Sequence, residues 1–297
     1  MTCSIVPRKV ITIGTNATTN VASSSAPDYN PATAYADGFV VIDPVTRIEY
    51  ESLQNSNTGH ALTDTLWWLS LGVENKLRMF DDSIGTQTAN SELIEIVLDL
   101  KKNVTTLALL NVVALEVQVV VEDSVGGVKL DKTIKTTEPS GGSWWKWHFS
   151  SITRVDRVLL DGLPSYSQAT IKIRIKNPGA IAKCGILVIG QRISLRMTQD
   201  GASVGFDDYS VKKRDEFGGF IINERAYSDT ARFQVFVQGS MVDNISRTLA
   251  KYRAQAALYI GTEELASTWI YGYFTSFENV FTDYGISDCN IEVESVT

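Results

Sequence analysis

Aromatic side chains near the start of the sequence are the residues whose types and spacing point most directly to chemistry. Tyr35, Tyr50, Trp67 and Trp68 all fall between residues 28 and 72. Flat rings stack on the apolar C–H faces of sugars, while nearby polar groups bind the hydroxyls. The same rings must also supply most of the core of so short a block. We expect Tyr35 and Trp68 to be core residues. Whether Trp67 and Tyr50 face solvent is left open, because adjacent strand residues point to opposite faces.

A second aromatic cluster, Trp144, Trp145 and Trp147, follows Gly141-Gly142. One member of the adjacent pair Trp144 and Trp145 should face outward, where it would serve equally well on a sugar or in a protein–protein interface. The candidate carbohydrate-binding residues are therefore Tyr35, Tyr50, Trp67, Trp68 and Trp144.

The residue types that carry catalysis are scarce. His60 and His148 are the only histidines, and the three cysteines lie far apart. A zinc site or a histidine relay therefore lacks the ligands and partners it needs. Gly-x-Ser-x-Gly and phosphate-loop motifs are absent. Gly201–Gly205 is interpreted as a structural turn and His60 as a solvated loop residue. We predict that the protein is not an enzyme and binds no cofactor.

Paired carboxylates are the remaining candidates for polar chemistry. Asp81 and Asp82 precede Ile84-Gly85-Thr86, and such a loop in a β-sandwich can bind a structural calcium ion through carboxylate and carbonyl oxygens. A solvated turn is the favoured interpretation, and no other metal site is predicted. Asp207 and Asp208 would serve a glycosidase only if they converged on a cleft. As neighbours in a turn, we expect them to be solvated.

Composition limits the class of protein further. The chain has 297 residues, of which 44% are hydrophobic and 21% charged, so it is globular, with two or three domains expected. Its net charge of −7 leaves no general basic face for nucleic acid. The first residues lack an apolar signal segment, and the run Leu107–Val121 is too polar and short to cross a bilayer. Sparse cysteines fit a reducing compartment. We expect synthesis in a cytoplasm and no membrane insertion.

Two segments are predicted before the middle of the chain. Within residues 1–27, Gly14–Pro27 is a Thr, Asn, Ser and Ala stretch that cannot bury a core. We expect an N-terminal arm there, held by a neighbouring subunit. Residues 28–72 follow as a small aromatic-rich β module, in which Asp37-Gly38 and Asp43-Pro44 mark turns before short strands.

Residues 73–190 are predicted to be β throughout. Apolar residues alternate along several runs, including a period-2 row from Val113 through Leu115 to Val121. Glycine and proline turns, Pro178-Gly179 among them, separate seven or more strands. This spacing is typical of an antiparallel sandwich of the jelly-roll kind.

Residues 191–297 change character and predict an α+β domain with one helix. Ser240–Gln255 repeats apolar residues at helical spacing, with Ser240 as a cap and Asp243 as its acidic capping partner. Phe217–Glu224 and Ala231–Val237 are expected to be paired strands. The predicted fold class is therefore mainly β: a small module, a jelly-roll sandwich and a C-terminal α+β domain.

The block at 28–72 resembles the small chitin- and cellulose-binding modules of bacterial chitinases. The residues at the matching places are Tyr29, Tyr35, Gly38, Val40, Tyr50 and Trp67/Trp68. The resemblance implies a carbohydrate-binding module. The middle sandwich is similar to galactose-binding-like jelly rolls, a likeness of fold that carries no ligand with it.

From about residue 28 to its end, the chain resembles a family of tailed-bacteriophage virion proteins. The stretches that carry the resemblance are Trp67–Gly72, Met79–Thr88, Gly201–Ser210 and Glu224–Ala226. The family implies a structural role in the tail tip or baseplate, in a symmetric ring with copies of itself and other tail proteins. It also implies a place in the virion after synthesis in the host cytoplasm, with the module available for host surface glycans. The alternatives are a neck, collar or decoration protein, and a receptor-recognition protein that binds host glycans.

Overall fold

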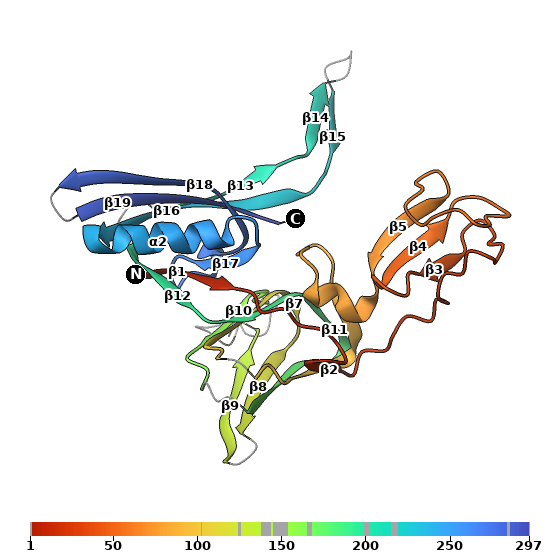
Figure 1. Cartoon of the computed structure of the whole chain (residues 1–297), viewed down its shortest axis with the longest axis horizontal. Coiled ribbons are helices and arrows are strands. Elements are labelled where there is room, and N and C mark those ends of the chain that lie inside the picture. The colour runs from red at the N-terminus through yellow and green to blue at the C-terminus, as the bar shows by residue number, and fades with distance from the viewer. Residues whose placement is uncertain are drawn as a thin grey trace.

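The computed structural model describes residues 2–101, 103–123, 126–137, 144, 154–164, 168–198, 202–214, 219–283 and 286–296. It confirms the predicted fold class: the chain is mainly β, built from antiparallel sheets, with a helix packed on one of them. Figure 1 shows a small N-terminal module, a central sandwich and a C-terminal sheet with its helix. A two-stranded hairpin rises away from the C-terminal sheet.

A three-stranded antiparallel sheet forms the module. Its strands are β3 (Val40–Ile42), β4 (Ile48–Ser52) and β5 (Trp68–Val73). Both predicted turns are present. Gly38 closes the first with φ +76°, a conformation that other residues rarely adopt. In the second, Asp43 accepts hydrogen bonds from the Val45 amide and the Thr46 hydroxyl, which orders the connection from β3 to β4.

The sandwich follows the short 3-10 helix η1 (Asn75–Phe80). Its strands are β2 (Ala17–Thr19), β6 (Thr88–Leu98), β7 (Thr106–Val113), β8 (Glu116–Asp123), β9 (Gly127–Lys135), β10 (Val158–Asp161) and β11 (Ala169–Gly190). The long strand β11 pairs with β6 along its length, with β8 in its first half and with β7 in its second. The antiparallel sandwich is therefore organised around one shared strand.

Two details of the sandwich differ from the sequence prediction. Pro178-Gly179 is not a turn between strands but an irregularity inside β11, where the pairing with β6 shifts register. Such a shift bends a strand without ending it. The period-2 row is correct from Val117 onward, but Val113 and Leu115 are only partly buried. The predicted row spans two strands, β7 and β8. The turn between them changes which alternate residues point into the core.

The C-terminal sheet has seven strands. In order they are β12 (Ile193–Thr198), β1 (Thr2–Pro7), β17 (Ala257–Ile260), β18 (Trp269–Asp283), β19 (Ile286–Ser295), β16 (Tyr227–Gln238) and β13 (Ser203–Asp208). A short 3-10 helix, η2 (Ala266–Thr268), precedes β18. Because β12 also pairs with β16, six of these strands close into a barrel. β13 remains outside the closure as an edge strand.

Helix α2 (Gly239–Tyr252) packs against this sheet. Its buried residues Val242, Ile245 and Leu249 share one apolar core with residues of β1, β12, β16 and β19, and Figure 1 shows the helix between these strands. The predicted cap is wrong. The helix begins one residue before Ser240, its N-cap residue is Gln238, and no side chain caps it. No helix in the described part of the chain is long and apolar enough to cross a membrane.

The N-terminal segment pairs with strands of its own chain. β1 pairs with β12 and β17 of the C-terminal sheet, and β2 pairs with β6 of the sandwich. The alternation of apolar residues in the first strand gives it a buried face, with Cys3 and Ile5 in the C-terminal core. The Thr- and Ser-rich stretch includes β2 itself, and its residues Ala17 and Val21 pack in the core of the sandwich.

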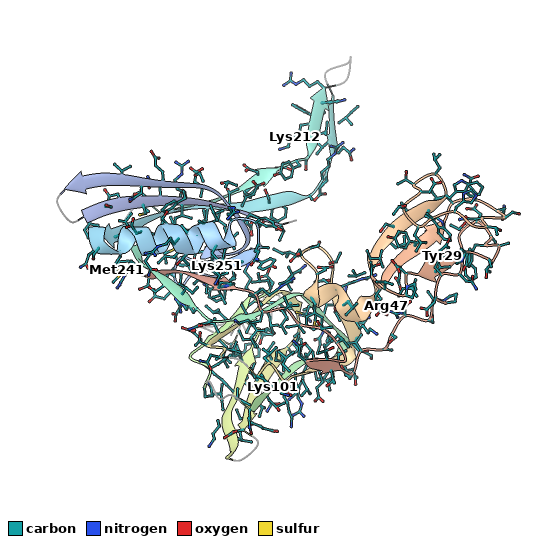
Figure 2. All side chains as sticks on the ribbon, in the orientation of Figure 1. Tyr29, Arg47, Lys101, Lys212, Met241 and Lys251 are labelled. Atoms are coloured by element: carbon teal, nitrogen blue, oxygen red, sulfur yellow. The ribbon has the colours of Figure 1, made fainter. Side chains whose placement is uncertain are left out.

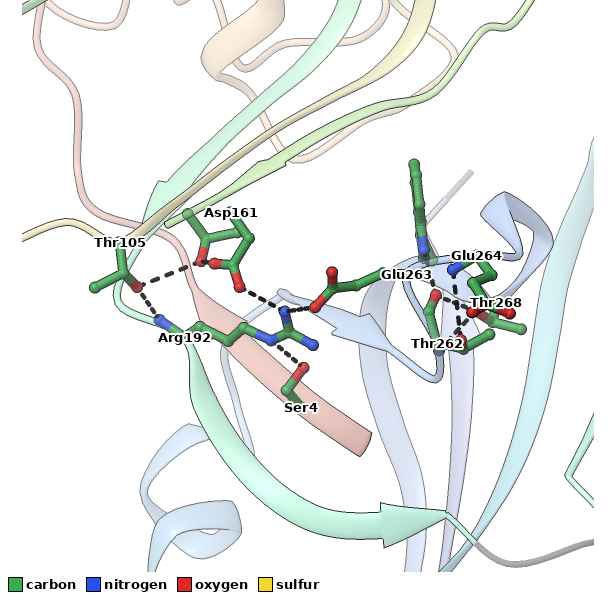
Figure 3. A network of polar contacts seen from close by, with 10 residues as sticks. Ser4, Thr105, Asp161, Arg192, Thr262, Glu263, Glu264 and Thr268 are labelled. Atoms are coloured by element: carbon green, nitrogen blue, oxygen red, sulfur yellow. Dashed lines mark hydrogen bonds and ion pairs between the residues drawn. The ribbon is translucent and has the colours of Figure 1, made fainter. Parts of the chain in front are cut away.

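A polar clasp joins the sandwich to the C-terminal sheet (Figure 3). Arg192, between β11 and β12, forms ion pairs with Asp161 of the sandwich and Glu263 of the loop after β17. Its Nε also donates to the Ser4 hydroxyl of β1 at 2.7 Å, and its backbone N–H donates to the Thr105 hydroxyl. One guanidinium therefore contacts segments from both bodies and from the N-terminus.

Candidate functional site

The aromatic residues of the module divide into a core and a rim. Tyr35 and Trp68 are buried and contact each other edge to face, with ring centroids 5.5 Å apart. The Tyr35 hydroxyl is engaged with the backbone of Asn30, and the Trp68 indole N–H donates to the carbonyl of His60. Both residues occupy the core position that the sequence predicted, so neither ring is offered to a ligand.

Trp67 and Tyr50 lie at the rim of this core, partly exposed. Trp67 stacks face to face with His60, with ring centroids 3.8 Å apart and planes 10° from parallel. The sequence prediction treated His60 as a solvated loop residue. The structure instead holds its backbone through hydrogen bonds from Tyr29 and Trp68 to its carbonyl, which fixes the imidazole against the indole. Nothing in the spacing of His60 and Trp67 could have indicated this contact, because it depends on how the loop before β5 folds.

Trp144 lies outside this group. It is 72% exposed and belongs to a part of the chain after β9, away from the module strands in sequence. Trp145, Trp147 and His148, which the sequence analysis also considered, fall outside the described residues. The structure therefore brings four of the five candidate rings together in the module, two inside and two at the rim.

A buried carboxylate attaches the module to the sandwich. Glu74, between β5 and η1, has a fully buried side chain that forms ion pairs with Arg47 and Lys76, both at 3.0 Å. It also accepts a hydrogen bond from the backbone N–H of Ser24. Burial acts to raise the pKa of Glu74, but hydrogen bonds from Arg47 and Lys76 hold that pKa below its usual range. Figure 2 places Arg47 at the junction of the two bodies.

The candidate calcium loop has protein partners for both of its carboxylates. Asp82 pairs with Arg8 at 2.9 Å and accepts the Tyr271 hydroxyl, while Asp81 accepts hydrogen bonds from Ser83 and Thr86. Burial raises the pKa of Asp81 in spite of those hydrogen bonds. A guanidinium therefore lies beside Asp82, where a metal ion would need space. Among the described residues, no group of three or more His, Cys, Asp or Glu side chains is placed to hold a metal.

A projecting ribbon is the feature that the sequence analysis missed. Strands β14 (Val211–Arg214) and β15 (Phe220–Asn223) pair only with each other and extend from the β13–β16 pair (Figure 1). Phe217–Glu224 was predicted to pair with Ala231–Val237, but β15 pairs with β14, and β16 pairs with β13 and β19. Of the predicted turn Gly201–Gly205, residues 203–205 instead belong to β13, and Gly201 lies outside the described residues.

A row of exposed apolar side chains follows one face of the ribbon, and we call it the hairpin stripe; Ile221, which is 59% exposed, lies on the opposite face. Its members are Val204 (48% exposed), Phe206 (68%), Phe220 (67%), Ile222 (65%) and Tyr227 (60%). Register places Phe220 and Ile222 opposite Arg214 and Lys212, on one face. An ion pair between Lys212 and Asp208 connects this face to that of β13. The stripe therefore runs continuously from the sheet edge onto the hairpin, where Figure 2 labels Lys212.

Comparisons with known proteins add little to this geometry. No protein-family model and no curated protein matches the chain. Among solved structures, it is similar to chitosan-binding module 1 of a chitosanase/glucanase from Paenibacillus sp. IK-5, at 15% sequence identity, covering 38% of this chain and 81% of that chain with a TM-score of 0.26. A superposition of that quality is not evidence of a shared fold. The resemblance to tailed-phage virion proteins receives no support from these comparisons and stays a prediction.

Proposed function

We propose that this protein is a structural component that assembles with copies of itself, with the hairpin stripe as its assembly surface. The supporting observation is the stripe: five large apolar side chains lie exposed along a ribbon whose hairpin has no core beneath it. Soluble monomers rarely leave contiguous apolar surface of this kind uncovered. Such a role requires no catalytic group and no cofactor.

The proposal is tested by removing apolar surface from the stripe. Full burial of a Phe or Ile side chain contributes about 1.5–3 kcal/mol, so Phe220→Ser with Ile222→Ser should weaken self-association by roughly a hundredfold or more. Analytical ultracentrifugation of the wild type and the double variant measures this directly. The matched control is Val128→Ser, because Val128 is 60% exposed on a different hairpin. A wild-type chain that stays monomeric at high micromolar concentration overturns the proposal.

The assembly that we propose is a ring in the tail tip or baseplate of a tailed bacteriophage, with other tail proteins as further partners. The family resemblance motivates this location, and a self-associating, mainly β chain is compatible with it. A cryo-EM reconstruction of the virion tests it. A ring of density at the distal end of the tail is the expected result. Density at the neck, at the collar or scattered over the particle would favour the alternative locations, and absence from the particle would overturn a virion role.

We also propose that the module binds glycans on the host surface. The favouring observation is the rim pair of Trp67 and His60, whose aromatic surface is fixed in place by the packing behind it. A preorganised ring suits stacking on a sugar, because little side-chain entropy is lost on binding. Copies in a ring would convert weak single contacts into avid attachment.

Substituting Trp67→Ala separates this role from folding. The core of the module is Tyr35, Val41 and Trp68, so the variant should keep its fold, while affinity for chitohexaose or cellohexaose should fall about tenfold or more. Leu66→Ala is the matched control, since Leu66 is 74% exposed and adjacent. Titration calorimetry that detects no glycan binding by the wild type, or equal binding by the Trp67→Ala variant, would refute the assignment.

A further inference from the structure

An acidic groove crosses the outer face of the C-terminal sheet, the face opposite α2. It consists of two adjoining hollows of about 470 and 440 Å³ that share Thr275 and Glu294. Its acidic side chains are Asp82, Asp207, Glu292 and Glu294. Arg8 and Arg232 neutralise Asp82 and Glu292. Among the described residues, Asp207 and Glu294 have no cationic partner, so the groove keeps a negative potential.

The groove also offers apolar contact. Tyr209 and Tyr273 line the second hollow, and both rings are substantially exposed. The hydroxyl of Tyr209 donates to Glu294 at 2.8 Å, which fixes the ring against the carboxylate. Aromatic rings beside carboxylates suit a partner that is both apolar and cationic.

The hairpin has that complementary chemistry. Lys213 and Arg214 are exposed, and neither has an anionic partner among the described residues. The Arg214 guanidinium lies 4.8 Å from the ring centroid of Phe220, so cation and apolar surface are presented together. The chain as a whole is acidic, with a net charge of −7. In the hairpin segment 211–223 the three cations outnumber the two acids, Asp215 and Glu216, which lie outside the described residues. The segment therefore carries a net positive charge within an acidic chain, and the acidic groove is complementary to it.

The hairpin of a chain cannot dock in the acidic groove of that same chain. In β13, Asp207 lines the groove while Phe206 belongs to the hairpin stripe, and adjacent strand residues point to opposite faces. The hairpin extends away from the sheet (Figure 1). A contact between these two different patches is heterologous, and repetition of such a contact generates a closed ring or an open filament.

We propose that the hairpin of one copy docks in the acidic groove of the next copy. This inference rests on the proposed self-assembly and adds the identity of the receiving surface. Arg214, which shares a face of the hairpin with Phe220, faces Asp207 and Glu294 of the neighbour, and Lys213 on the opposite face adds to the positive charge of the hairpin. The apolar side chains of the hairpin pack on the tyrosines of the groove.

Two charge variants of the full chain test the contact. The donor variant carries Lys213→Glu with Arg214→Glu. The acceptor variant carries Asp207→Lys with Thr275→Lys, both at exposed positions. It leaves the side-chain ion pair of Glu292 and the side-chain hydrogen bonds of Glu294 in place, and it removes the hydrogen bond from the Thr275 hydroxyl to the backbone carbonyl of Glu292. Each variant alone should self-associate at least tenfold more weakly than wild type. Lys132→Glu with Lys135→Glu is the matched control, because it makes the same charge change on the exposed hairpin strand β9.

Mixing the two variants gives the decisive result. The acceptor variant keeps an intact hairpin and the donor variant an intact groove, and the reversed hairpin and the reversed groove are again opposite in charge. A one-to-one mixture should therefore recover the assembly that neither variant shows alone. Circular dichroism and thermal melting establish that both variants are folded. An acceptor variant that assembles like wild type overturns the groove as the docking site while leaving hairpin assembly standing. A wild-type chain that stays monomeric overturns both proposals, and pairing of hairpin with hairpin would appear as normal assembly of the acceptor variant.

Discussion

The attachment of the module depends on one buried carboxylate, and Glu74→Gln tests how strongly. The Glu74 side chain accepts hydrogen bonds from Nε and Nη2 of Arg47 at 3.1 and 3.0 Å and from the Ser24 amide at 3.2 Å, and it pairs with Lys76 at 3.0 Å. Glutamine keeps the shape but removes the charge and turns an amide N–H₂ toward cationic donors. Hydrogen bonds to charged groups contribute about 1.5–3 kcal/mol each.

The expected loss is about 3 kcal/mol in the free energy of unfolding. We use the low end of the range for two cationic contacts, because Arg47 and Lys76 are 29% and 17% exposed and regain some hydration. For a unit of about 150–250 residues that unfolds cooperatively, a loss of about 3 kcal/mol lowers Tm by roughly 6–12 °C. Differential scanning calorimetry at neutral pH measures it, with Glu278→Gln as the control because Glu278 is exposed. A loss below about 0.5 kcal/mol would refute the reasoning.

The pH dependence supplies a second check on the same residue. The pKa of Glu74 is lower in the folded chain than in the unfolded chain. Its contribution to stability is therefore fully present above the unfolded value, near 4.3, and is lost as pH falls through the folded value. The stability difference between wild type and Glu74→Gln should shrink as pH falls below about 4.3. A difference that stays constant down to pH 3 would contradict the assignment.

Three further predictions concern the C-terminal sheet and the cysteines. Burial raises the pKa of Cys3 and Cys184 to about 12, and Cys289 is also buried. A thiol reagent should therefore label the native chain slowly and should label all three cysteines after denaturation. Fast labelling of the native chain would contradict this. Gly272→Ala places a Cβ 1.9 Å from a backbone carbonyl of β19 and should cost about 1–3 kcal/mol or more in denaturant unfolding. Arg192→Met removes the clasp of Figure 3 and should cost about 2–3 kcal/mol; unchanged stability in either variant would show that the contact is dispensable.

Local pattern was sufficient to predict most of the elements. The alternation of apolar residues located the strands of the sandwich, and the repeat of Ile245 and Leu249 located α2, because both periodicities follow directly from backbone geometry. Partners of strands were harder to predict. β15 and β16 are consecutive, and only the position of β14 decides that they do not pair. The pairing of β1 with β12 and β17 joins residues almost two hundred and more positions apart, which no local pattern encodes.

For the candidate site, too, the sequence predicted which rings are buried but not which side chains contact each other. Composition placed Tyr35 and Trp68 in the core of the module because a short block has few other groups to bury. The stack of His60 on Trp67 required the loop conformation. The hairpin stripe had a visible signal in the run Phe220 to Ile222, three apolar residues in succession beside the cations of β14. A run of that kind cannot alternate between core and solvent, so it indicates either full burial or an interface.

The junctions inside the molecule differ from its exposed ribbon, and this difference favours the proposal that the protein assembles with copies of itself over a role as a monomer. At the junctions within the chain, the charged side chains all have partners. Glu74 has three partners where the module meets the sandwich, and Arg192 has partners from three segments where the sandwich meets the C-terminal sheet. Where it meets solvent along the ribbon, apolar side chains and cations stand uncovered. An exposed hairpin bearing apolar side chains is an aggregation hazard unless a partner covers it. In the docking that we propose, the acidic groove of a neighbouring copy would cover the hairpin, so the same feature that endangers a monomer would direct an ordered oligomer.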